Sequence, residues 1–159
     1  MILVLGCLVL MSVFILGVNN TETGQIKNTL TNQAIISATS IAQTLLEQIQ
    51  TESFDQKTVN NSVSTPDSLT APALLGRDAG ETTITTFNDV DDYNNYTETD
   101  TLGVLGTFNV KATVSYCTKM NPDVSSSSRT FSKRVDIAVY NKYLLFIDTL
   151  KISKVISYY

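Results

Sequence analysis

The sequence predicts an α+β protein in which one long N-terminal helix packs on a C-terminal antiparallel β-meander. Residues 1–18 carry no charge, and only Ser12 among them is conventionally polar. Apolar side chains then recur at spacings of three and four as far as Ile49, and the C-terminal third alternates apolar and polar residues. We therefore expect an N-terminal helix at 1–52 and a globular β domain with irregular loops at 53–159.

The apolar run at 1–18 is the strongest single signal in the chain. A helix rises ~1.5 Å per residue, so this run would extend roughly 27 Å, close to the ~30 Å hydrocarbon core of a bilayer. We expect residues 1–24 to be buried either in a membrane or among copies of the same helix in a filament core. The side chains expected in that core are Met1, Ile2, Leu3, Val4, Leu5, Leu8, Val9, Leu10, Val13, Phe14, Ile15 and Leu16.

Residues 25–52 are expected to form the amphipathic half of the same helix. Its apolar stripe begins at Ile26 and would cover the apolar face of the β-sheet. Gly17 and Gly24 flank a run of poor helix formers, which predicts a helix break or an easily unwound stretch between them. Glu22 is the first charge after the apolar run, so we expect it at a subunit interface near a cation or amide cluster of a neighbour.

The β domain is predicted from alternation. In residues 106–116, every second residue from Phe108 to Tyr116 is expected on one apolar face of a strand. In residues 130–140, every second residue from Phe131 to Val139 is expected on the apolar face of a second strand, and Lys133 is one of them. Residues 144–159 supply a third strand of the meander, and Asn and Pro residues mark the turns. The stretch 82–87 has β-propensity but little length, and 88–96 is an acidic, aromatic loop.

Composition argues against several classes of function. The net charge is −4 and the pI is about 4.7, which disfavours nucleic acid as a partner. The chain has no histidine and therefore lacks the commonest general base and transition-metal ligand. The spacing of nucleophiles and bases shows no catalytic pattern, so we expect no enzyme activity and no cofactor.

The loop at 88–96 contains one candidate cation site. Asp89, Asp91 and Asp92 could ligate Ca²⁺ through their carboxylate oxygens. However, no glycine-bearing calcium loop and no distal glutamate follow them. The alternative is that these side chains cap turns, which is the commoner role of Asp in such loops. We favour that alternative.

The organisation of the chain resembles type IV pilins and pseudopilins. The resemblance rests on the uncharged N-terminus, the long helix and the β-meander, and covers nearly the whole chain. The strings 42–49 with Phe54-Asp55, and 87–94, look like strings in bacterial MSHA-type pilin-like proteins. The chain departs from the family pattern at Leu5, where pilins usually carry a glutamate that registers an incoming subunit, and it lacks the proline usual near position 22.

The resemblance implies a structural subunit of an extracellular, type IV pilus-like filament of identical subunits. It also implies an inner-membrane location before assembly and a dedicated assembly machinery as partner. Because Leu5 cannot pair with an amine, subunit register would come from shape and apolar packing. Two alternatives stay open: a minor pilin or pseudopilin of a secretion system, and a membrane-anchored extracellular domain that binds through the loop 89–96.

Overall fold

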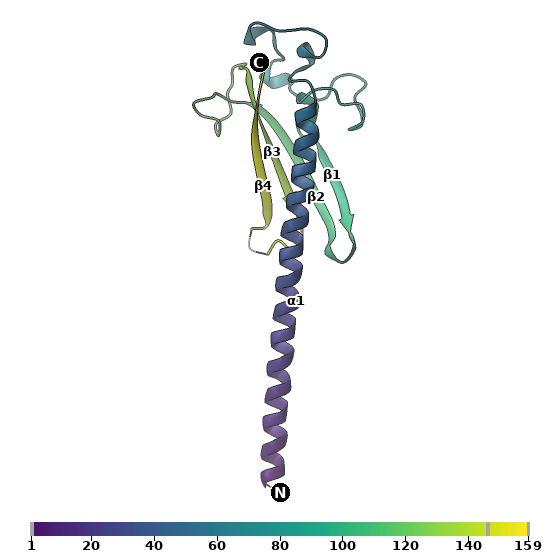
Figure 1. The fold of residues 1–159 in the computed structure, drawn as a ribbon, viewed down its shortest axis with the longest axis vertical. Helices are drawn as coiled ribbons and strands as arrows, with labels where there is room; N and C mark the ends of the chain where they lie inside the picture. Colours follow the sequence, from purple (N-terminus) through teal and green to yellow (C-terminus); the bar gives the residue numbers. More distant parts are fainter. Residues whose placement is uncertain (1, 146, 159) are drawn as a thin grey trace.

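The computed structural model describes residues 2–145 and 147–158, so Met1, Phe146 and Tyr159 lie outside it, as do the side chains of Ile2, Leu3 and Asn20. The helix α1 (Ile2–Thr51) is followed by the strands β1 (Thr97–Leu102), β2 (Gly106–Tyr116), β3 (Ser132–Tyr140) and β4 (Thr149–Ser157). All adjacent strands pair antiparallel in the order β1-β2-β3-β4. The predicted α+β class, a long helix on an antiparallel meander, is confirmed (Figure 1).

The second half of α1 packs on the sheet because small residues recur along one of its faces. Ala34, Ala38 and Ala42 are fully buried and lie four residues apart, so they stack on one side of the helix. Their small side chains let the sheet approach closely, and Ile49 continues the same buried face. The predicted stripe began too early, because Ile26 is 61 % exposed and lies before the part of α1 that contacts the domain.

The central strands form the other side of the core through paired apolar residues. In the β2–β3 ladder, Val110 lies opposite Val139, and Val114 opposite Val135. All four side chains are buried, and such cross-strand pairs are the main stabilising unit of a sheet. The predicted inward faces of both strands are therefore confirmed. The last strand, β4, is shorter than the predicted 144–159.

Two features of the β domain differ from what the local sequence pattern indicated. The stretch 82–87 forms turns, and the strand β1 at Thr97–Leu102 was not predicted. β1 has no inward apolar face comparable to that of β2, and is held by its ladder to Gly106–Lys111. Its pairing depends on the position of β2, which local sequence pattern does not encode.

The first half of α1 extends beyond the β-sheet as a free stalk, and the N-terminus lies at the end of the molecule remote from the C-terminus (Figure 1). At the other end α1 stops at Thr51, and Asp55 caps the short 3₁₀ helix Gln56–Thr58. Ser53 then forms an isolated bridge with Asp89. The end of α1 is thus tied to the loop at 88–96, and both lie beside the start of β3.

Candidate functional site

The first candidate site is the exposed apolar surface of α1. From Val4 to Val18, the large apolar side chains are between 42 % and 72 % exposed, and Leu10 and Phe14 are the most exposed of them. These side chains include the described members of the predicted assembly core, from Val4 to Leu16. A contiguous apolar surface of this kind marks contact with a membrane or with another protein.

By length and composition, α1 is able to span a membrane. Its most apolar window lies near the N-terminus, and none of that window is buried against the rest of the chain. Apolar core helices of soluble proteins are mostly buried, so exposure of this segment distinguishes it from them. The helix is compatible with anchoring in a bilayer.

The predicted break between Gly17 and Gly24 was wrong, because α1 is helical throughout Ile2–Thr51. The hydroxyls of Thr21 and Thr23 donate to the carbonyls of Gly17 and Asn19, at 3.0 and 2.8 Å. In this way the side chains of two residues of low helix propensity form hydrogen bonds with the backbone of the preceding helical turn. Glu22 is exposed on this stretch, between the apolar half and the domain.

The second candidate site is a buried charge cluster centred on Lys133 at the start of β3. The Lys133 Nζ is completely buried and lies 2.9 Å from Asp55 Oδ2 and 2.5 Å from Asp91 Oδ1. It also donates to the carbonyl oxygen of Phe54 at 2.7 Å. The Phe54 and Tyr116 rings lie 4.4 and 5.1 Å from it, so aromatic faces close the site on two sides.

Asp55 has hydrogen-bond partners on both carboxylate oxygens. Its Oδ1 accepts from the backbone N–H groups of Lys57 and Thr70 and from the Thr70 hydroxyl, and its Oδ2 accepts from the Tyr116 hydroxyl at 3.1 Å. Burial acts to raise the pKa of Asp55, but the charge of Lys133 and these hydrogen bonds hold that pKa below its usual value. Asp55 is therefore the stable anion of the cluster while Lys133 carries its charge.

The loop at 88–96 folds into the interior, and its carboxylates cap turns. Asp89 Oδ1 accepts from the backbone N–H groups of Asp91 and Asp92, and Asp92 Oδ2 accepts from those of Asn88 and Asp89. These contacts support the turn-capping alternative for Asp89 and Asp92, whereas Asp91 pairs with Lys133. Within residues 2–145 and 147–158, no group of three acidic, histidine or cysteine side chains is arranged to hold a metal ion.

Burial alters the acidity of this loop. It raises the pKa of Asp89 to about 8, assisted by the charges of Asp91 and Asp92. Burial likewise raises the pKa of Asp91 to about 7, although the charge of Lys133 opposes the change. Asp89 Oδ2 and Asp91 Oδ2 are buried without a hydrogen-bond partner among the described residues. Both side chains therefore favour the protonated form more than an ordinary aspartate does.

Replacing Asp89 with asparagine should flatten the dependence of stability on pH. The folded protein holds the Asp89 proton up to about pH 8, whereas an unfolded chain releases it near pH 3.8. The unfolded state binds fewer protons in this window, so the free energy of unfolding of the wild type falls as pH rises, by on the order of a few kcal/mol. Asp89→Asn keeps a capping oxygen and cannot titrate.

Thermal melts of both proteins from pH 4 to pH 8 measure this difference. The melting temperature of Asp89→Asn should rise relative to that of the wild type as pH increases from 4 to 8. Asp123→Asn, at an exposed position, is the matched control and should follow the wild type. Parallel curves for the wild type and Asp89→Asn would contradict a buried, protonated Asp89.

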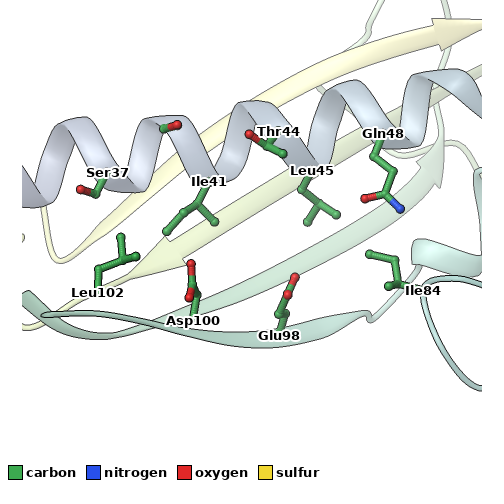
Figure 2. Close-up of a pocket in the computed structure, with 10 residues that line it drawn as sticks. Ser37, Ile41, Thr44, Leu45, Gln48, Ile84, Glu98, Asp100 and Leu102 are labelled. Atoms are coloured by element: carbon green, nitrogen blue, oxygen red, sulfur yellow. The ribbon is translucent and has the colours of Figure 1, made fainter.

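A groove of about 510 Å³ lies between α1 and the edge strand β1 (Figure 2). Ile41 and Leu45 line its α1 wall, and the carboxylates of Glu98 and Asp100 line its β1 wall. The Tyr96 hydroxyl donates to Glu98 at 3.1 Å. The groove therefore has hydroxyl and apolar groups along its α1 wall and acidic groups along its β1 wall.

Comparison with family models, with curated proteins and with solved structures finds no match for this chain. The structure alone therefore supports the functional argument. Sequence reasoning placed Lys133 on the inward face of β3 and identified Asp91, but it did not bring them together with Asp55. The signal was present, because a lysine at an inward strand position needs a buried anion as its partner.

Proposed function

We propose that this chain is a structural subunit of an extracellular, pilus-like helical filament, built by packing the apolar half of α1 against the same segment of other copies. One observation carries the proposal. The side chains from Val4 to Val18 form a continuous apolar surface on a stalk that the globular domain does not cover. A subunit with such a stalk needs either lipid or identical helices around it.

The energetics favour burial of the stalk in one of these two environments. Burying a large apolar side chain contributes roughly 1.5–3 kcal/mol relative to leaving it in water. Summed along the stalk, this makes the free subunit insoluble and an assembled filament long-lived. Transfer from lipid to a helix bundle gains much less, so the proposal includes an inner-membrane stage and a machinery that supplies work for extraction.

Features outside the apolar segment favour a filament over a monomeric anchor. Ile26 is 61 % exposed and Ile36 is 70 % exposed, so apolar surface continues along α1 towards the domain. In a filament this part of the helix would face neighbours. The alternative of a binding domain that uses the loop 89–96 loses support, because Asp89, Asp91 and Asp92 are at most 2 % exposed.

Electron microscopy of material sheared from cells that express the chain tests the proposal. Filaments labelled by an antibody against the β domain are the expected result. Recovery of the chain only in the membrane fraction, with no labelled filament, would overturn the filament and leave the anchored domain.

Replacing Glu22 with glutamine should change assembly without changing the fold. Glu22 is exposed between the apolar stalk and the domain, where a neighbour's helix would lie in a filament. A charge brought into such an interface is paired or hydrated, so neutralising it should alter filament yield or salt resistance. Glu47→Gln is the matched control, because Glu47 is exposed on the domain half of α1.

Filament yield and disassembly in rising salt are the measurements, with the melting temperature of the domain as the test of folding. If Glu22→Gln filaments match both the wild type and Glu47→Gln in these properties, Glu22 is a solvated surface charge and not an interface residue.

A further inference from the structure

We propose that Lys133 and Asp91 become joined by an amide bond between Lys133 Nζ and Asp91 Cγ, formed within the folded chain with release of one water molecule. The inference goes beyond the proposed function and does not depend on it. It rests on the arrangement of three side chains brought together from the end of α1, the loop 88–96 and the strand β3.

The first support is the position of the amine. Lys133 Nζ lies 2.5 Å from Asp91 Oδ1, and therefore beside the carboxyl carbon to which that oxygen is bonded. Holding the amine and the carboxyl group in direct contact makes their reaction intramolecular, which lowers the entropic part of the barrier. Backbone elements fix both groups, because Lys133 lies in β3 and Asp91 in a short 3₁₀ helix, Asp91–Tyr93.

The second support is the division of roles between the two carboxyl groups. Asp55 accepts hydrogen bonds on both oxygens and lies 2.9 Å from Lys133 Nζ, so it is placed to take a proton from the ammonium. Asp91 Oδ2 is buried and has no partner among the described residues, which leaves it available as the departing oxygen. The raised pKa of Asp91, about 7, provides the neutral acid that an amine can attack.

The step balances in atoms and charge. The Lys133 ammonium gives one proton to the Asp55 carboxylate, and the free amine attacks Cγ of the Asp91 carboxylic acid. The Nζ–Cγ bond forms, the bond from Cγ to one oxygen breaks, and a second Nζ proton leaves with that hydroxyl as water. An amide, a neutral Asp55 and one water molecule replace an ammonium, a carboxylate and a carboxylic acid, with no oxidant or reductant.

The third support is the dryness of the site. Lys133, Asp55 and Asp91 are at most 2 % exposed, and the rings of Phe54 and Tyr116 flank the amine. Formation of an amide from an amine and a carboxylic acid is unfavourable in bulk water. In a buried site that excludes water, the released water molecule leaves and the amide is not hydrolysed. The reaction also replaces a buried ion pair, whose desolvation is costly, with a neutral amide. The bond would close a covalent ring that contains β1 and β2.

Intact-mass spectrometry of the full chain, purified folded in detergent and then denatured, tests the inference. The expected mass is below the sequence mass by one water molecule. Trypsin should yield peptide 78–111 joined to peptide 130–134, because amidated Lys133 resists cleavage and the neighbouring sites are Arg77, Lys111, Arg129 and Arg134. Lys133→Arg and Asp91→Ala should each show the full sequence mass.

The wild-type measurement decides the question even where a variant fails to fold. Folded wild-type protein at its full sequence mass, with free peptide 130–133 after digestion, would overturn the inference. A cross-linked peptide that contains Asp55 in place of Asp91 would overturn the assignment of Asp91 as the acceptor.

Discussion

Replacing Leu10 with aspartate is expected to weaken membrane retention and to prevent filament formation while leaving the β domain folded. Leu10 is 72 % exposed in the middle of the apolar stalk. An aspartate at the centre of a membrane helix costs roughly 2.5–3.5 kcal/mol on insertion scales, which is on the order of a hundredfold in partition. In a filament core the same charge would be buried without a partner in every copy, so the cost repeats along the polymer.

Cell fractionation and electron microscopy measure these effects, and the melting temperature of the domain reports folding. Leu10→Met is the matched control, because it keeps the volume and the apolar character of the side chain. It should insert and assemble like the wild type. Normal filaments from Leu10→Asp would show that the stalk is not buried in the assembled protein.

Replacing Lys133 with methionine should cause a large loss of stability of the domain. The substitution leaves Asp55 and Asp91 buried without their cation, and removing one member of a buried charge cluster costs about 3–5 kcal/mol. For a domain of this size, that corresponds to a fall in melting temperature of more than about 10 °C.

Thermal melting of the full chain in detergent measures the loss. The matched comparison is the triple variant Lys133→Met, Asp55→Asn, Asp91→Asn, in which no charge of the cluster remains. It should recover much of the stability, because a neutral cluster carries no unpaired charge. Equal melting temperatures for Lys133→Met and the wild type would show that the cluster contributes little to the fold.

These two predictions concern different parts of one subunit. The exposed apolar stalk lies outside the domain, while the Lys133 cluster holds the end of α1 to the sheet. Asp55 follows α1 directly and contacts Lys133 in β3, so tension on the helix would reach the sheet at this point. A covalent bond at Lys133 would secure the loop 88–96 to the same strand.

Local sequence pattern determined the long helix and most of the sheet. The uncharged run and the small residues from Ala34 to Ala42 specify one apolar and one amphipathic helix segment, because helical periodicity depends only on neighbours along the chain. Alternation specified β2 and β3 in the same way, including the inward position of Lys133.

Tertiary structure decided the remaining features. Local propensity predicted a break at Gly17–Gly24, but the helix runs through it. The strand β1 exists because β2 offers a ladder to it. The predicted polar loop 88–96 is buried because Asp89 bridges Ser53 after α1 and Asp91 pairs with Lys133 in β3. The partners of Lys133 come from residues 55 and 91, which are far from it along the chain. A buried charge needs a partner of opposite charge. Which residue becomes that partner depends on distances in the folded protein, and a local sequence pattern does not contain them.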